Sequence, residues 1–154
     1  MLDVLVAGGG PSGLAAAIDL AQRGRKVMIV EPQSRTIDKA CGEGLMPDAL
    51  EALRRLGVEN LCGMPLRGIA YYQGQHSASA DFPHSGGLGV RRLVLHEAMR
   101  QRAVALGVQT VTDRISHLKQ HEDRVEANGF VARYLIGADG LRSTVRSTLF
   151  SHTI

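Results

Sequence analysis

The chain has 154 residues, a formal net charge of +3 and a hydrophobic fraction of 44%. This length suits one ordinary domain, and the composition is typical of a globular protein rather than a disordered one. Aromatic residues make up only 4% of the chain, and its cationic residues are scattered. The sequence therefore predicts no nucleic-acid partner, because neither base-stacking side chains nor a polybasic surface is present.

The two cysteines, Cys41 and Cys62, have neither a C-x-x-C spacing nor a metal-ligand spacing. They predict no disulfide framework and no metal site, and they favour a reduced, cytoplasmic protein. The apolar start of the chain has no basic flank and is interrupted by Asp3, so it does not have the pattern of a signal peptide. No apolar run is long enough to predict a transmembrane segment.

The first 31 residues have the pattern of a β-α-β unit. Residues 2–7 are apolar except for Asp3 and predict a buried strand. Three glycines follow, and Pro11 then suits the first turn of a helix that ends at Gly24. The apolar positions of this helix recur at the i, i+3, i+4 and i+7 spacing: Leu14, Ala17, Ile18 and Ala21. Residues 26–31 predict a second buried strand.

The spacing of the apolar residues changes from helical to alternating in the middle of the chain. Residues 32–46 predict a loop, and Pro47 opens a short helix that ends at Gly57. An antiparallel insertion is expected over roughly residues 64–90, where apolar and polar residues alternate and glycines such as Gly74 and Gly86 mark turns.

Helical spacing then resumes at Leu95 and ends at Gly107, and a strand is expected over residues 108–112. A small antiparallel meander over residues 114–133 is predicted to turn at Asn128-Gly129. Residues 134–138 predict another buried strand, and Ser143 begins a last helical turn or two. The resulting parallel sheet has the predicted order 108–112, 26–31, 2–7 and 133–138.

Residues 8–13 form a G-x-G-x-x-G motif between a buried strand and a helix. In this context Gly8 allows a tight turn, Gly10 lets a diphosphate approach the backbone, and Gly13 lets the helix pack closely on the strand. The helix N-terminus faces the diphosphate charge. Glu31 ends the second strand, where its carboxylate accepts hydrogen bonds from ribose hydroxyls. The motif therefore predicts a dinucleotide site that suits either NAD or FAD.

The segment after Glu31 favours FAD. An NAD domain would continue with a helix and a parallel strand, whereas this chain inserts a loop, a short helix and an antiparallel sheet. The insertion resembles the FAD domain of the aromatic-hydroxylase and geranylgeranyl-reductase superfamily of flavoproteins. Two further motifs are similar to that superfamily. Arg92 matches the arginine of its R-x-x-L-x-x-x-L helix start, and residues 137–146 match its G-A-D-G-x-x-S-x-V-R signature, which includes Asp139.

The resemblance implies a cofactor site that binds FAD, with Arg92 near the diphosphate and ribityl chain and Asp139 along the ribityl-diphosphate portion. Residues 39–47 are similar to the K-x-C-G-x-G-L-x-P stretch of the reductase branch, which approaches the flavin ring. Cys41 in that stretch is either a proton donor or a small packing residue. No catalytic residue is assigned. The residues predicted to bind the cofactor are Gly8, Gly10, Pro11, Ser12, Gly13, Glu31, Arg35, Arg92 and Asp139.

The expected fold is a doubly wound, Rossmann-like α/β FAD-binding domain over residues 1–154, with an antiparallel β insertion and an incomplete C-terminal part. The implied activity is NAD(P)H-dependent monooxygenation of a small organic substrate or reduction of an isoprenoid double bond. An NAD-binding enzyme and a non-catalytic nucleotide-binding fragment remain alternatives. Family members continue with a further parallel strand, so residues 133–138 are predicted to form an edge suited to self-association or a partner chain.

Overall fold

The computed structural model describes residues 1–36, 38–39, 43–82 and 86–150. The chain forms two compact units, one of Met1–Ile37 with Met99–Ile154 and the other of Asp38–Ala98. The predicted antiparallel insertion at residues 64–90 lies inside the second unit. In the part of the chain that the structure describes, no helix is both long and apolar enough to cross a membrane.

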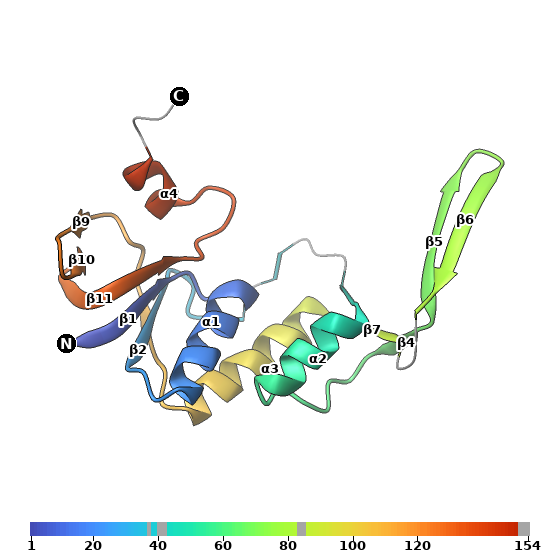
Figure 1. Cartoon of the computed structure of the whole chain (residues 1–154), viewed down its shortest axis with the longest axis horizontal. Coiled ribbons are helices and arrows are strands. Elements are labelled where there is room, and N and C mark those ends of the chain that lie inside the picture. Colours follow the sequence, from blue (N-terminus) through green and yellow to red (C-terminus); the bar gives the residue numbers. More distant parts are fainter. Residues whose placement is uncertain (37, 40–42, 83–85, 151–154) are drawn as a thin grey trace. The chain divides into compact units, whose positions relative to one another are not determined.

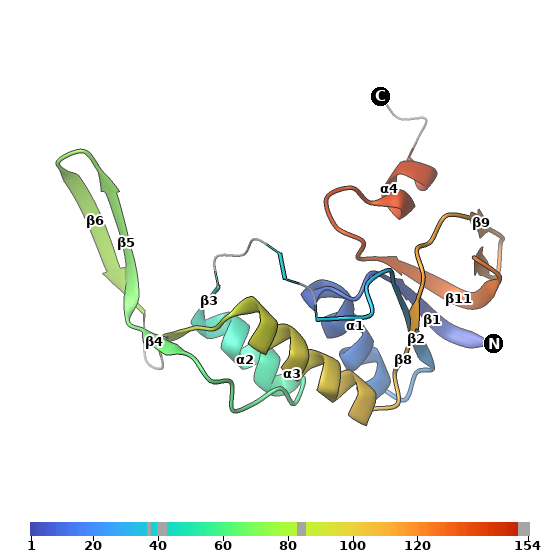
Figure 2. The same ribbon diagram turned by 180° about the vertical axis from the view of Figure 1, so that it is seen from behind.

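A six-stranded sheet organises the first unit, with the order β8-β2-β1-β11-β10-β9. The first four strands are parallel, and β10 and β9 continue the sheet in antiparallel fashion. This confirms the predicted order of the parallel strands; Figure 1 shows β1 between β2 and β11, and Figure 2 shows β8 from behind. The strands are β1 (Leu2–Ala7), β2 (Val27–Glu31), β8 (Gln109–Thr112), β9 (Leu118–Gln120), β10 (Val125–Ala127) and β11 (Phe130–Gly137).

Helices lie on both faces of this sheet, as expected for a doubly wound fold. Helix α1 (Pro11–Gln22) packs against β1 and β2 and buries the predicted Leu14, Ala17 and Ile18. The core on the other face includes Val145 of α4 (Thr144–Leu149) but no residue of α1. The members of that core are Leu5, Ala7, Val30, Ile115, Val125, Ala127, Ala132 and Val145.

The meander that precedes β11 turns where the sequence predicts. Asn128 and Gly129 separate β10 from β11, with φ values of 47° and 81°. Both values are positive, as the two central residues of a type I′ hairpin turn require, and Asn-Gly tolerates them. The Asn-Gly pair therefore fixes the register in which Ala127 faces Phe130.

The second unit contains short strands and a helix. Its sheet has the order β3-β7-β4, and α2 packs against β3 and β7. The elements are β3 (Gly44–Leu45), α2 (Pro47–Arg55), β4 (Met64–Leu66), β5 (Gly68–Gln73), β6 (His76–Asp81) and β7 (Gly87–Gly89). Helix α3 (Arg92–Ala105) begins in this unit and ends in the first.

Strands β5 and β6 form the predicted hairpin around Gly74, which has a φ of 59°. Figures 1 and 2 show this pair as a two-stranded ribbon. All six residues of β6 are exposed, and so are Tyr71 and Tyr72 of β5. The alternation predicted from about residue 68 onward therefore identifies this antiparallel pair, although neither face of the ribbon is buried within the described residues.

The outer edge of β11 is open over the second half of the strand among the described residues. Strand β10 covers residues 130–132, because Ala132 pairs with Val125 and Phe130 with Ala127. From Arg133 to Gly137, β11 has a strand only on the β1 side among the residues that the structure describes. This open stretch coincides with the edge predicted at residues 133–138, up to the end of the strand at Gly137.

Candidate functional site

Three strands of the first unit end at the same edge of the sheet. The N–H of Gly8, just after β1, donates to the carbonyl of Val30 at 2.9 Å, and the N–H of Ala138, just after β11, donates to the carbonyl of Ala7 at 2.7 Å. The loops that follow β1, β2 and β11 therefore meet. In doubly wound folds, ligands bind at the carboxyl ends of parallel strands, next to the point where the strand order reverses.

The glycine loop packs as tightly as glycine permits. Gly8 has a φ of 102°, and a Cβ on it would overlap the carbonyl oxygen of Ala138. A Cβ on Gly13 would overlap the carbonyl oxygen of Gly8 and lie 3.3 Å from the Cβ of Ala138. Both glycines are buried. The first turn of α1 is thus held against the loop with no room for side chains, which is the backbone arrangement that a diphosphate needs for close approach.

Gly10 is the N-cap of α1, with a φ of −68° and a ψ of 176°. Its carbonyl accepts the N–H of Leu14 at 2.9 Å. Pro11 occupies the first helical position, and Ser12 beside it is exposed. The positive end of the α1 dipole is therefore directed toward the edge where the strands end, so a negatively charged group is stabilised there.

The carboxylate of Glu31 is fixed beside the glycine loop by two backbone groups. Its Oε2 accepts the N–H of Gly9 at 2.7 Å, and its Oε1 accepts the N–H of Gln33 at 3.0 Å. A carboxylate has about four lone-pair sites, so about two remain for hydroxyl donors. Because the backbone already holds the carboxylate, Glu31 does not have to become ordered when a ribose binds.

Asp139 holds the start of α4. Its Oδ1 accepts the hydroxyl of Ser143 at 2.6 Å, and its Oδ2 accepts the N–H groups of Thr144 at 2.6 Å and Val145 at 3.2 Å. Burial alone would raise the pKa of Asp139, but the hydrogen bonds from Ser143 and from these backbone groups outweigh it and lower the pKa. Ser143 is itself the N-cap of α4 and accepts the N–H of Arg146.

The structure brings most of the predicted cofactor residues together in the first unit. Gly8, whose added Cβ would lie 3.0 Å from the Cα of Asp139, links the glycine loop to the β11 end. Arg35 is exposed in the loop after β2, in the same unit, and no contact places it against the glycine loop. Arg92 belongs to the second unit. Cys41 lies outside the described residues.

The side chain of Arg92 contains a buried Nε with no hydrogen-bond partner among the described residues. A buried donor without an acceptor costs free energy. An anionic group would supply an acceptor of the right charge. Within the first unit, the glycine loop and the anchored Glu31 are compatible with FAD.

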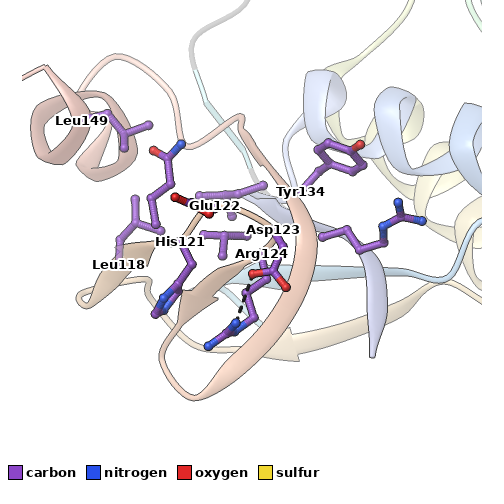
Figure 3. Close-up of a pocket in the computed structure, with 11 residues that line it drawn as sticks. Leu118, His121, Glu122, Asp123, Arg124, Tyr134 and Leu149 are labelled. Carbon is purple, nitrogen blue, oxygen red and sulfur yellow. Dashed lines mark hydrogen bonds and ion pairs between the residues drawn. The ribbon is translucent and has the colours of Figure 1, made fainter.

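A second concavity lies beside the open half of β11, with a volume of about 480 Å³ (Figure 3). Its walls come from the β9–β10 turn, from β11 and from Leu149 of α4. Figure 3 shows the polar residues of the turn and Tyr134 around this pocket, with an ion pair of 3.1 Å between Arg124 and Asp123. None of the predicted cofactor residues lines it.

Two sets of side-chain contacts between separate segments were not predicted from the sequence. Glu43 binds the first residue of α3 through its carboxylate, at 2.8 Å from the Arg92 nitrogen. Asn128 binds the 113–117 segment through both its amide atoms. An Asn-Gly pair signals a turn but not these partners, and no local pattern reports a contact across 49 residues, such as that of Glu43.

Known relatives of the chain include a monooxygenase and a reductase. The chain is 30% identical to the rifampicin monooxygenase of Streptomyces venezuelae over 97% of its own length and 34% of that protein. It is 32% identical to the menaquinone reductase of Mycolicibacterium smegmatis over 96% of its own length and 39% of that protein. The chain thus spans between a third and two-fifths of these relatives.

The fold is similar to that of p-nitrophenol 4-monooxygenase from Pseudomonas putida, with a TM-score of 0.84 and 24% identity, over 97% of this chain and 43% of that one. The family model described as "FAD binding domain" matches residues 1–152. The chain therefore belongs to the FAD binding domain family, and its cofactor is FAD.

Proposed function

We propose that the chain is the FAD-binding part of an NAD(P)H-dependent oxidoreductase that acts on a small organic substrate. The observation that carries this proposal is the fixed Glu31 carboxylate beside a glycine loop at the start of α1. When bound, the flavin accepts reducing equivalents and passes them to the substrate or to oxygen, while the protein binds and orients it.

Each residue of the predicted set has a proposed role. Gly8, Gly10 and Gly13, with Pro11 and Ser12, form the backbone cradle for the diphosphate. Glu31 accepts the hydroxyls of the adenosine ribose through its remaining lone pairs. Arg35 and Arg92 provide cationic groups for the phosphates.

Asp139 acts on the cofactor indirectly. Its carboxylate oxygens already accept three hydrogen bonds from the start of α4. Its proposed role is therefore to hold α4 at the end of β11, against which Gly8 packs.

Two reaction classes suit the proposed parent enzyme, monooxygenation and reduction of an isoprenoid double bond. One relative is named a monooxygenase and another a menaquinone reductase. The resemblance of residues 39–47 to the reductase branch favours reduction. The cytoplasmic location stays a prediction from the spacing of the two cysteines.

The assignment of the adenosine half is tested by titrating the purified chain with FAD and with FMN, which lacks that half, and following the quenching of flavin fluorescence. FAD is expected to bind much more tightly. Glu31→Gln should weaken FAD binding by about 1–3 kcal/mol, because a charge-assisted hydrogen bond becomes a neutral one. Equal affinity for the two flavins would contradict the assignment, and a purified protein without flavin absorbance that binds NAD instead would favour the NAD alternative.

The open half of β11 supports a proposed interface. Residues 133–137 present backbone groups without a strand partner among the described residues, and the pocket of Figure 3 lies beside them. Tyr134 and Leu149, which line this pocket, are 64% and 45% exposed. An added strand would satisfy the backbone groups and cover the apolar side chains. The proposed partner is a second copy or another chain.

A further inference from the structure

Glu43 makes two contacts with the segment that enters α3. Its carboxylate oxygen Oε1 accepts the N–H of Arg92 at 2.8 Å, and its carbonyl oxygen accepts the N–H of Val90 at 2.7 Å. The next residue continues the same pairing, because Gly44 of β3 faces Gly89 of β7. All of these residues lie in the second unit. The end of the 38–43 loop is therefore attached to the residues that begin α3.

The contact replaces a cap that the local sequence cannot supply. The carbonyl of Arg91 accepts the N–H groups of Val94 and Leu95, so Arg91 is the N-cap of α3. An arginine side chain has no hydrogen-bond acceptor and cannot satisfy the free N–H groups of the first turn. Glu43 provides that acceptor, and its negative charge is favourable at the positive end of the helix.

The backbone of Glu43 is held in an uncommon conformation, with a φ of 52°. Residues other than glycine and asparagine rarely adopt this region, and they remain there only when surrounding contacts require it. Here the two hydrogen bonds and the β3–β7 pairing are those contacts. The conformation aims the carboxylate at the Arg92 N–H.

We propose that Glu43 is a positioning residue of the cofactor site, which acts by fixing the start of α3 and thereby the direction of the Arg92 side chain. This inference rests on the proposed role of Arg92 in binding FAD. Because the Glu43 carboxylate already occupies the Arg92 backbone N–H, the guanidinium is the group of this residue that remains for the cofactor. Its buried Nε, which has no hydrogen-bond partner in the part of the chain that the structure describes, agrees with a role of the guanidinium in binding the cofactor.

A double-mutant cycle on FAD affinity tests the proposal, with FAD titrated against the parent chain, Glu43→Ala, Arg92→Ala and the double variant. Glu43→Ala should weaken FAD binding about three- to tenfold, and Arg92→Ala should weaken it at least as much. In the Arg92→Ala background the Glu43 substitution should have no further effect. Glu43→Gln keeps an acceptor at the same length and should restore most of the affinity.

Two matched variants complete the experiment. In Glu43→Asn the new residue tolerates the positive φ, but its side chain is too short to reach Arg92. This variant should therefore bind FAD as weakly as Glu43→Ala does. It replaces the alanine variant in the test if that variant fails to fold. Glu51→Ala, in α2 of the same unit, removes a carboxylate that pairs with Arg54 and Arg55 and should leave FAD affinity unchanged. Thermal unfolding without FAD reports whether each variant is folded.

The outcomes separate this inference from the proposed function. If Arg92→Ala binds FAD as tightly as the parent chain, Arg92 does not belong to the cofactor set, and the role proposed for Glu43 fails with it. If Arg92→Ala weakens binding and folded Glu43→Ala or Glu43→Asn does not, only the Glu43 inference is overturned. Additive losses in the double variant overturn it as well, because Glu43 would then act independently of Arg92.

Discussion

Gly10 and Gly13 belong to one motif but differ in what surrounds them. Gly10 has the extended backbone of an N-cap, which any residue adopts, so Gly10→Val should fold. Its branched side chain would occupy the space of the diphosphate, and we expect no measurable FAD binding.

In Gly13→Ala the Cβ would overlap the Gly8 carbonyl oxygen, so we expect a lower free energy of unfolding, by about 1–3 kcal/mol.

Flavin-fluorescence titration and thermal unfolding of the flavin-free proteins measure the two effects separately. A folded Gly10→Val protein with unchanged FAD affinity would show that this loop is not the phosphate site.

Asp139 makes the stability of the first unit depend on pH. Its pKa is lowered in the folded protein, because the hydrogen bonds from Ser143 and from the backbone of α4 outweigh the opposing effect of burial. The ionised carboxylate therefore contributes stability above the ordinary aspartate pKa of about 3.9, and this contribution is lost as the pH falls through the lower folded value.

Asp139→Asn should accordingly lower the free energy of unfolding at neutral pH by about 1–2 kcal/mol and flatten its decline below about pH 4. Urea unfolding at several pH values measures both effects. Asp123→Asn is the control, because Asp123 is exposed and, among the described residues, its ion pair is with the neighbouring Arg124 of the β9–β10 turn. Parallel pH profiles for the parent chain and Asp139→Asn would contradict the assignment.

At the scale of elements, Asn128 joins the β10–β11 turn to the segment that follows β8. Its amide nitrogen donates to Asp113 and to the Arg114 carbonyl, each at 2.8 Å, and its oxygen accepts the N–H of Ser116 at 3.0 Å. The hydrogen bond from Asn128, followed by that from the Arg114 backbone, lowers the pKa of Asp113.

Substitution of Asn128 separates the hydrogen bonds from the backbone conformation. Asn128→Gly keeps the positive φ and loses the bonds, so we expect a destabilisation of about 1–3 kcal/mol. Asn128→Ala should cost about 1 kcal/mol more, because alanine is strained at this φ. Asn60→Gly is the control, since Asn60 also has a positive φ, of 57°. Equal stability of the glycine and alanine variants in denaturant titrations would argue against strain at this turn.

Elements with a strong period were predictable from the sequence. Local sequence patterns identify the β1-α1-β2 unit, α3 and the Asn-Gly turn. Once the strands are identified, the way the chain connects them indicates the order of the parallel strands in the sheet. Strand β3 has only two residues and carries too little pattern to predict. The burial of the β5–β6 ribbon was not predictable either, since alternation fixes the faces of a strand but not what packs on them.

The candidate site was predictable to the same degree. The glycine loop and Glu31 lie within one β-α-β unit, so sequence spacing places them together. The contacts of Asp139 with α4 and of Glu43 with Arg92 depend on how separate elements meet, which no local pattern records.

At the scale of the whole molecule, the open half of β11 is the place where we expect association. Tyr134→Lys adds a charge at this edge and should shift the purified chain toward the monomer. A second chain that paired with the edge would have to bury the ammonium group of the lysine. Light scattering coupled to gel filtration measures the change. Tyr72→Lys is the matched control, since Tyr72 is 79% exposed on the β5–β6 ribbon. A decrease in association for Tyr72→Lys alone would place the interface on the ribbon.

The position of β1 also has a consequence for biosynthesis. This strand precedes the other strands of its sheet in the chain, yet it lies between β2 and β11, and β11 begins only at Phe130. Contacts of such long sequence separation form late and slow folding. The Gly8 loop packs against Ala138, so the proposed flavin cradle is complete only after the residues up to Ala138 have been synthesised. Until then β1 has one edge without its strand partner, and an unpaired strand edge of this kind is prone to pair with other chains.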